Sequence, residues 1–321
     1  MKLDGITTFV AVAEAGSISE AARRLRLAKS VVSSRLAELE RALGTALVHR
    51  TTRRLSLTED GTAFLDRASR IAREVEEAAA DLAERRGTLA GPLRIAAPVT
   101  FARLHLGPAL YPFLAEHPHI ELTLELDDRR VDAAADGYDA VVRHGAVADT
   151  RLVAWKLARS RRVLVAAPSY LARAGAPTTV AELERHHGIF YTNRGVADWR
   201  FPGPSDALVV KSRSALRVNN GDVMRDAAIA GLGLALLPMF VVADACTSGA
   251  LRVVRVDVEP ETEFLYIAHP EGRRASAKLR ALADHLRSTF GDPPYWESGE
   301  APGRPPPPDP ARNLTSLARL P

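Results

Sequence analysis

The sequence predicts an α/β protein in which a small helical module and one long helix precede a larger part of alternating strands and helices. Two observations support this fold class. Apolar residues recur at helical spacing near the N-terminus, and short apolar stretches of strand length alternate with helical ones from Leu93 onward. A chain of 321 residues can form two or three domains with separate cores.

Basic residues are concentrated at the N-terminus. Residues 1–58 contain ten Lys or Arg and five Asp or Glu, which leaves 33 basic and 34 acidic residues in the rest of the chain. A solvated basic surface is one explanation. The other is a surface that binds the phosphates of nucleic acid, and the helix pattern described next favours it.

The N-terminal module begins with two helices separated by a glycine. Phe9 and Val12 lie in the first helix, which is expected to end at Gly16, a residue suited to a C-terminal cap. Ser17 and Glu20 have the spacing of a capping box and start the second helix.

A third helix follows after three residues. Its apolar residues recur in steps of four, three and four and therefore share one buried face: Val32, Leu36, Leu39 and Leu43. We expect small polar and basic residues to point outward, towards phosphates and base edges: Lys29, Ser30, Ser33, Ser34 and Arg35. An amphipathic surface helix has the same spacing, but the tight turn before Lys29 favours a DNA-binding helix-turn-helix.

Residues 46–57 predict a small hairpin, which would make the module a winged helix-turn-helix. Arg50, Arg53 and Arg54 lie on this wing, where they can contact phosphate or the minor groove. A solvated basic hairpin is the alternative. Together with Ser17, these residues complete the expected contacts to double-stranded DNA.

A long helix follows the wing and can be capped by Thr58. Its apolar residues follow a heptad pattern: Phe64, Ala68, Ile71, Val75, Ala78 and Leu82. Packing against the chain's own body is one interpretation of this pattern. We prefer a dimer seam, because a helix between two domains has few other surfaces to cover it.

The sequence after the hinge at Gly91 and Pro92 alternates between strands and helices. Strands are predicted at 93–97, 120–126, 140–142 and 163–165, with a helix entered through Pro98 to Phe101. From Gly291 the chain is rich in proline and has no apolar period, so we expect residues 291–321 to form a disordered tail. A Pro-rich partner motif is the alternative there.

The sequence shows no set of catalytic residues. It has no Gly-x-Ser-x-Gly elbow, phosphate-binding loop or His-Glu-x-x-His helix. The pairs His117 with His119 and His186 with His187 fit surface loops better than a metal site, and Cys246 fits a buried thiol. We therefore expect no enzyme activity, no metal and no cofactor. Without a signal peptide or a transmembrane run, a cytoplasmic protein is expected.

The N-terminal pattern resembles the signature of LysR-type transcriptional regulators of bacteria. The matching positions are Phe9, Gly16, Ser17, Ala21, Ala22, Leu25, Val32, Ser33, Leu39, Glu40, Leu43, Gly44, Leu47, Arg50, Leu57, Thr58 and Gly61. The sequence departs from this pattern at Ala28, where the family usually has a Ser or Thr cap.

The resemblance covers about residues 1–290 and implies a domain organisation. It comprises a winged helix-turn-helix at 1–58, a dimerising linker helix with a hinge at 59–90, and a two-lobed effector-binding domain at 91–290, similar to periplasmic binding proteins. The first lobe would take about 93–163 with 268–290, and the second 164–267, with two crossing strands as the hinge.

Ligands of open α/β sheets collect at the carboxyl ends of strands and between lobes. By resemblance, the residues expected at the effector site are Thr100, Phe101, Arg143, His144, Thr192, Asn193 and Asn219. An Arg and helix amides around one cleft predict an anionic ligand, such as an organic or aromatic acid. The alternative for Thr100 is a helix cap, and the alternative for Arg143 is an ion pair with an acid such as Asp139.

The sequence thus predicts a LysR-type regulator that reads an inverted-repeat promoter site and binds a small-molecule effector. Its expected partners are DNA, the effector, a second copy in a dimer, two such dimers in a tetramer, and RNA polymerase; no membrane partner is expected. The rival interpretation is a ligand-binding transport protein or an enzyme on a periplasmic-binding-protein-like fold.

Overall fold

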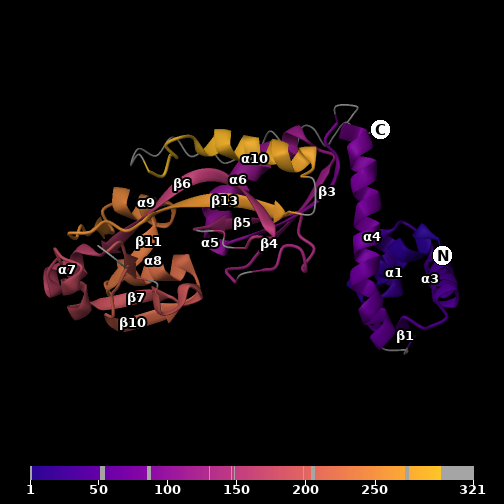
Figure 1. Ribbon diagram of the computed structural model, residues 1–321, viewed down its shortest axis with the longest axis horizontal. Helices are drawn as coiled ribbons and strands as arrows, with labels where there is room; N and C mark the ends of the chain where they lie inside the picture. The colour runs from indigo at the N-terminus through magenta and orange to yellow at the C-terminus, as the bar shows by residue number, and fades with distance from the viewer. Residues whose placement is uncertain are drawn as a thin grey trace. The chain divides into compact units, whose positions relative to one another are not determined.

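The chain divides into two compact units, Met1–Gly91 and Pro92–Pro321. The computed structural model describes residues 2–50, 55–84, 88–129, 131–145, 147, 149–197, 199–203, 207–271 and 275–297 (Figure 1). Each helix in these ranges is too short or too polar to cross a membrane.

The first unit has the winged helix-turn-helix order that the sequence predicts. It consists of α1 (Leu3–Ala15), α2 (Ile18–Arg24), α3 (Lys29–Leu43), the hairpin strands β1 (Val48–Arg50) and β2 (Leu55–Leu57), and α4 (Glu59–Glu84). Gly16 ends α1 in the left-handed conformation, with φ of 61°, as expected of a helix cap. The Ser17 hydroxyl accepts a hydrogen bond from the Glu20 amide and caps α2.

One apolar core joins the helices of this unit. Its buried residues come from all four helices and the wing: Ile6, Phe9, Val12, Ala21, Ala22, Val32, Leu36, Leu39, Leu47, Val48 and Ala68. The Glu40 carboxylate fixes the wing against α3, because it accepts hydrogen bonds from the amides of Leu47 (2.9 Å) and Val48 (3.3 Å). A side chain at Gly61 would collide with the Leu47 carbonyl, so only glycine allows α4 to begin this close to the wing.

The heptad residues of α4 do not form one continuous seam. Phe64 lies 5.6 Å from the Phe9 ring and Ala68 is fully buried in the core of the same unit. Ile71 and Val75 are 36% and 41% exposed. The prediction of a dimer seam is therefore wrong for Phe64 and Ala68, which pack within the unit, while Ile71, Val75 and Ala78 remain available to a partner. The Leu82 side chain lies outside the described residues.

The second unit is built on one extended, mixed sheet. Its strand order is β10 (Arg213–Val218), β7 (His187–Tyr191), β11 (Leu234–Pro238), β6 (Leu152–Ala166), β13 (Thr262–Pro270), β5 (Ala140–His144), β3 (Gly91–Ala97) and β4 (Ile120–Leu126). Strand β12 (Arg252–Val253) also pairs with β6, and β8 (Arg200–Phe201) pairs with β9 (Leu208–Val209) in a separate hairpin.

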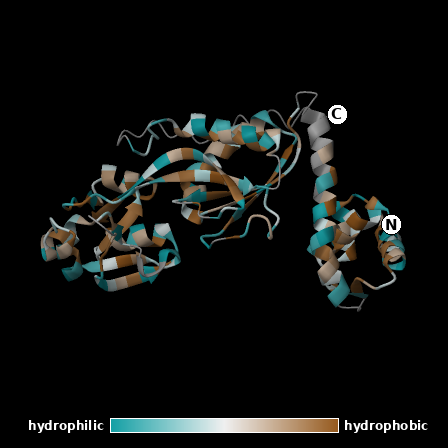
Figure 2. Ribbon diagram, viewed as in Figure 1, coloured by the Kyte–Doolittle hydropathy of each residue, from teal (hydrophilic) through white to brown (hydrophobic). Residues whose placement is uncertain are grey.

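Helices cover this sheet at both ends. Near β3 lie α5 (Val99–Phe101), the π-helical turn η1 (Ala102–Leu106), α6 (Gly107–Glu116) and α10 (Ala277–Phe290). The other end carries α7 (Pro168–Ala174), α8 (Gly221–Ile229), α9 (Met239–Thr247) and the 3₁₀ turns η2 (Ala181–Arg185) and η3 (Thr192–Ala197). In Figure 2, brown hydrophobic residues gather on the strands, and α10 carries teal hydrophilic turns on its surface.

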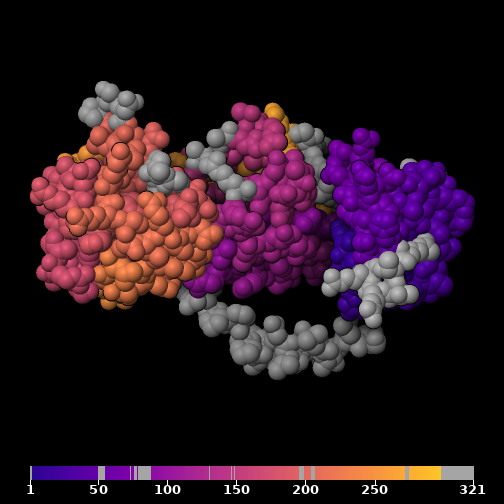
Figure 3. All heavy atoms as spheres, turned by 90° about the horizontal axis from the view of Figure 1, so that it is seen from below, coloured from indigo at the N-terminus to yellow at the C-terminus, as the bar shows by residue number. Residues whose placement is uncertain are grey.

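Two antiparallel strands connect the lobes. β6 pairs with β13 from Leu152 to Arg161 and with β11 from Arg162 to Val165, so β6 carries the chain from lobe I (β3, β4, β5) to lobe II (β7, β10, β11). β13 returns to lobe I and pairs with β5 over Leu265–Ala268. Residues 265–267, which the sequence assigned to the second lobe, therefore belong to the first. Figure 3 shows lobe I in magenta beside lobe II in salmon and orange.

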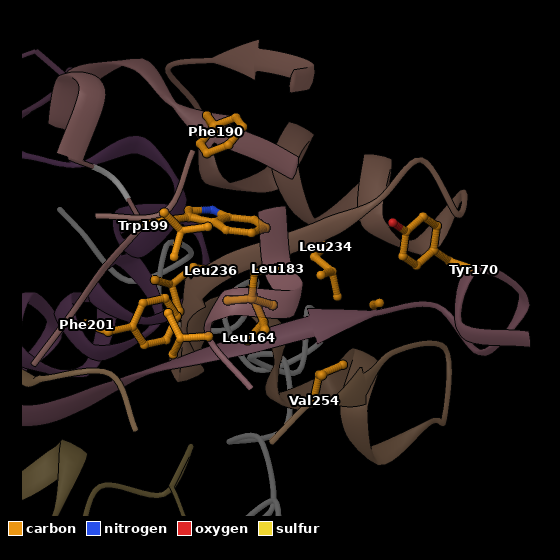
Figure 4. Packing of buried hydrophobic residues seen from close by; sticks show 12 residues of the cluster. Leu164, Tyr170, Leu183, Phe190, Trp199, Phe201, Leu234, Leu236 and Val254 are labelled. Atoms are coloured by element: carbon orange, nitrogen blue, oxygen red, sulfur yellow. The ribbon is translucent and has the colours of Figure 1, made fainter. Parts of the chain in front are cut away.

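Lobe II has its own aromatic core (Figure 4). Trp199 and Phe201 are fully buried, and the Trp199 ring lies 5.1 Å from that of Phe190. Leucines of β6 and β11 pack beneath them: Leu164, Leu234 and Leu236. The end of β6 anchors this core to the strands that connect the lobes, so lobe II can move as one body about them.

The chain after α10 does not leave the fold at Gly291. Trp296 is only 2% exposed, and the Glu297 carboxylate accepts hydrogen bonds from the amide (2.8 Å) and Nε (2.9 Å) of Arg161. The prediction of a disordered tail from residue 291 is therefore wrong for residues 291–297. This stretch is rich in proline and has no apolar period, but the aromatic side chains of Tyr295 and Trp296 bury enough surface to hold it against the fold. Residues 298–321 lie outside the described residues.

Candidate functional site

The outward face of α3 is small and polar at its N-terminal end. Lys29, Ser30 and Ser34 are exposed, in agreement with their predicted positions, whereas Ser33 is half-buried. Val31 is also on this face, with 38% of its surface exposed. Ala28 at the helix start provides no side-chain cap, so the first amides of α3 have no side-chain acceptor at that position.

Arg35 lies on the flank of α3 that faces α1. Its guanidinium forms an ion pair of 2.9 Å with Asp4, and only 32% of its side chain is exposed. The expectation that Arg35 points outward with Ser30 and Ser34 is therefore wrong. The helical spacing shows the reason: Arg35 is one residue before the buried Leu36, and Asp4 attracts it towards α1.

The other predicted DNA contacts differ in how well the structure describes them. Ser17 is half-buried and its hydroxyl is used to cap α2, a structural role. Arg50 ends strand β1, although its side chain lies outside the described residues. Arg53 and Arg54 lie wholly outside them.

A cavity of about 700 Å³ lies where both lobes and the hinge strands meet. Its volume is within the range of small-molecule sites. One part of its wall is apolar: Phe101, Met224, Leu236, Pro238, Phe240 and Val241. The remaining wall carries charged and polar side chains, among them Asp128, Arg143, His144, Arg162, Asn193, Arg194 and Glu263.

Asp128 joins the two lobes beside this cavity. Its carboxylate accepts hydrogen bonds from the Val99 amide in lobe I (3.0 Å) and from the Asn220 side chain in lobe II (3.0 Å). Its backbone carbonyl accepts another from the Asn193 side chain. Opening of the lobes would break the bonds to Asn193 and Asn220.

The Thr100 hydroxyl is hydrogen-bonded to a residue of the protein itself, Asp222. The Thr100 hydroxyl accepts a hydrogen bond from the Asp222 amide (3.1 Å) and donates one to the Asp222 carboxylate (3.2 Å). Burial opposes ionisation of Asp222, but Arg103 and Arg225 outweigh it and hold its pKa below the ordinary value. The expectation of an open anion seat at Thr100 is not met, because an anion there would face Asp222.

Two arginines of the cavity wall are held by backbone carbonyls. Arg143 donates to the Val131 carbonyl (2.6 Å), and Arg162, which is 6% exposed, donates to the Leu236 carbonyl (2.9 Å). Asp139, considered as a partner for Arg143, accepts a hydrogen bond from the Arg94 amide. Both also act on nearby carboxylates: Arg162 helps to lower the pKa of Glu263, and Arg143 helps to lower that of Asp149.

His144 belongs to a charged cluster that spans both lobes. Its ring lies 3.2 Å from the Glu263 carboxylate on β13 and 3.1 Å from the Ser160 hydroxyl on β6. Arg194 of lobe II holds the same carboxylate in a bidentate ion pair, with bonds of 2.7 and 2.6 Å. Burial lowers the pKa of His144 to about 4, although Glu263 opposes the shift, so the ring is neutral at pH 7.

Not every residue expected at the effector site lines the cavity. Phe101, Arg143, His144 and Asn193 do, as predicted, together with Thr100. Thr192 and Asn219 are exposed and do not belong to the lining. Thr192 begins the turn η3 and Asn219 lies between β10 and α8, where Tyr191 and Gly221 line the cavity instead.

The sequence did not predict Asp128, Arg162, Arg194, Phe240 or Glu263 as cavity residues. Arg162 and Glu263 lie on the crossing strands, so a charged residue inside an apolar strand was the available signal. Among the described residues, no group of three or more His, Cys, Asp or Glu side chains could hold a metal ion.

Two family models match the chain. The model described as "Bacterial regulatory helix-turn-helix protein, lysR family" matches residues 3–62, and "LysR substrate binding domain" matches residues 86–291. The match boundaries enclose the winged module and the two-lobed unit.

Similar proteins cover nearly the whole chain. An HTH-type transcriptional repressor of Pseudomonas aeruginosa is 33% identical over 91% of this chain and 93% of its own. The regulator DmlR of Escherichia coli is 30% identical over 90% and 95%.

Two solved structures of full-length regulators are similar to this chain. The LysR-type regulator CrgA of Neisseria meningitidis is 28% identical, with a TM-score of 0.56 over 90% of this chain and 98% of that one. The Vibrio cholerae virulence activator AphB is 25% identical, with a TM-score of 0.55 over 90% and 99%. The names of these proteins agree with the prediction of a regulator and not an enzyme.

His144, with 11% of its side chain exposed, predicts a pH dependence of stability. Its pKa is about 4 when folded and 6.5 in its ordinary state, so below pH 6.5 the unfolded chain takes up a proton that the folded chain does not. The free energy of unfolding should fall as the pH decreases through this window and be fully retained above it. From pH 7 to 5.5 the loss from this group is about 1 kcal/mol.

The measurement is urea unfolding followed by tryptophan fluorescence, since all three tryptophans lie in the second unit. His144→Gln has no titrating ring and should lose about 1 kcal/mol less than the parent over the same pH range. Equal losses in the two proteins would mean that His144 is protonated in the fold.

Proposed function

The chain belongs to the LysR family of bacterial transcriptional regulators, and we propose that it reads an inverted-repeat promoter site and responds to a small anionic effector held between its lobes. The observation that carries this proposal is the combination, in one chain, of an exposed polar face on α3 and a cavity that both lobes and the hinge strands enclose.

Reading of the DNA would fall to the outward face of α3. Ser30 and Ser34 can donate to phosphates or base edges, and Lys29 adds a positive charge at the same end of the helix. Val31 offers an apolar contact, and the thymine methyl group is the apolar group of the major groove. Arg50, Arg53 and Arg54 of the wing would add phosphate or minor-groove contacts.

The inverted repeat follows from a two-fold dimer of this module. The exposed Ile71, Val75 and Ala78 of α4 support a partner helix at this position. A second contact, between effector domains, would make a tetramer; exposed apolar side chains such as Val223 and Leu232 are available for it. Paired reading heads bind a palindromic site whose symmetry mirrors their own.

The effector would bind at Arg143 and Arg162, not at Thr100. Both arginines line the cavity, and a guanidinium that donates one hydrogen bond to a carbonyl has further N–H groups that can donate to a carboxylate. The wall formed by Phe101, Met224 and Phe240 suits the apolar body of an organic acid. Binding would change the angle between the lobes, and with it the spacing of the two winged helix-turn-helix modules of the dimer. That spacing would set the bend of the DNA and the access of RNA polymerase to the promoter. The protein would act in the cytoplasm.

We expect Ile71→Asp to dissociate the dimer without unfolding the first unit. The side chain is exposed in a single chain, so the substitution leaves the core of that unit intact. In the dimer, the new carboxylate would be buried opposite the same carboxylate of the partner helix. Affinity for an inverted repeat should fall to that for a single half-site. Sedimentation and gel shift provide the two measurements.

Ala63→Asp is the matched control, since it adds the same charge at an exposed position of the same helix. Ala68→Asp should unfold the first unit, because Ala68 is fully buried there. If Ile71→Asp sediments at the size of the parent, α4 does not carry the dimer contact.

The anionic effector is tested with matched ligand pairs. In a thermal-shift screen of small organic acids, the acid that raises the melting temperature of the full chain most should lose its effect when its carboxylate is replaced by a carboxamide. Arg143→Gln should lower the affinity for the acid by roughly tenfold or more, because a charge-assisted hydrogen bond is lost. A carboxamide that stabilises the chain as well as the acid does would rule out an anion site.

A further inference from the structure

The last described residues turn back onto the end of α10. The amide of Tyr295 donates to the Phe290 carbonyl (3.1 Å), and that of Glu297 donates to the Pro294 carbonyl (2.8 Å). Tyr295, Trp296 and Glu297, which we call the C-terminal clasp, place three side chains behind the apolar wall of the cavity. Each side chain contacts a different part of the second unit.

Trp296 packs among aromatic rings from both lobes. Its ring lies 5.2 Å from Phe290 and 4.9 Å from His105 in lobe I, and 6.3 Å from Phe240 in lobe II. The indole N–H donates to the Arg159 carbonyl on β6, at 3.2 Å. Phe101 and Phe240 both line the cavity, and both rings also contact the Trp296 ring.

Tyr295 links lobe I to the backbone of lobe II through one histidine. The His105 Nε2 atom lies 2.9 Å from the Phe240 carbonyl, and a carbonyl can only accept, so Nε2 carries the proton. In the neutral ring, Nδ1 must then accept from the Tyr295 hydroxyl, at 2.6 Å. The Tyr295 hydroxyl thereby favours the His105 tautomer with its proton on Nε2, and this proton binds the Phe240 carbonyl near the start of α9.

Glu297 holds the hinge strand at the point where its partner changes. Arg161 is the last residue of β6 paired with β13, and Arg162 is the first paired with β11. The Glu297 carboxylate, with 9% of its side chain exposed, accepts from both the amide and Nε of Arg161. Any bend of β6 between the lobes would strain these two bonds.

We propose that the C-terminal clasp is a positioning element of the effector site, which holds Phe101 and Phe240 as the rear wall of the cavity and sets the angle between the lobes. The three residues do not contact the ligand; they act through the wall and the hinge. The inference rests on the proposed function only in taking this cavity as the effector site.

The test compares two truncations of the chain. One ends at Glu297 and keeps the clasp; the other ends at Gly291 and lacks it. Spin labels at Glu121→Cys in β4 and Arg213→Cys in β10, both exposed, report the distance between the lobes in a Cys246→Ser background. The shorter chain should show a broader or displaced distance distribution.

Hydrogen exchange gives the local readout. Amides of residues 236–242, which include Phe240, should exchange roughly tenfold faster or more in the chain that ends at Gly291. Amides of β7 in the core of lobe II serve as the internal control and should keep their protection. A uniform rise in exchange over lobe II would indicate general destabilisation and would overturn the proposal.

Point variants keep the test decisive if the shorter chain does not fold. Tyr295→Phe removes only the hydroxyl that binds His105, and Tyr111→Phe is its matched control because Tyr111 is 62% exposed. Trp296→Ala should change the distance distribution between the spin labels as removal of the clasp does. Trp296→Phe, which keeps an aromatic ring, should give a distribution close to that of the parent chain. Unchanged distances and exchange in Tyr295→Phe and Trp296→Ala would overturn the proposal. A gel shift of the unaltered chain tests the proposed function separately.

Discussion

The two antiparallel strands β6 and β13 are the constraint on which the second unit depends. β6 pairs with strands of both lobes, and β13 runs beside it, paired with it from Leu152 to Arg161, so the lobes cannot separate but can rotate about one line. The cavity exists because helices and loops of both lobes meet beside this line. A ligand there contacts both sides of the hinge, which is the condition for a ligand to shift the angle between lobes.

Charge is placed along the same line. Glu263 on β13 lies between His144 of lobe I and Arg194 of lobe II, and Arg162 on β6 lines the cavity nearby. Asp128 and Asp222 connect the lobes at other points through Asn220 and Thr100. Such partly buried polar contacts favour one lobe arrangement over others, because a shift of the lobes would break hydrogen bonds that water only partly replaces.

Local patterns predicted the elements well, and contacts between distant residues account for what they missed. Helical spacing located α3, and alternation located β4 from Ile120 to Leu126. The same spacing could not show that Asp4 pairs with Arg35, or that Asp222, 122 residues further along the chain, binds Thr100. The composition of residues 291–297 likewise concealed that Trp296 docks between the lobes.

The most direct test of this account fixes the lobes together without a ligand. Cysteines at Asp128 and Asn193, in a Cys246→Ser background, would form a reversible disulfide across the lobe contact. With the cross-link verified by mass, the bend of bound promoter DNA is measured by circular-permutation gel shift in the oxidised and reduced chain. We predict different bend angles in the two states. Equal bends would contradict coupling between the lobes and the DNA-reading helices.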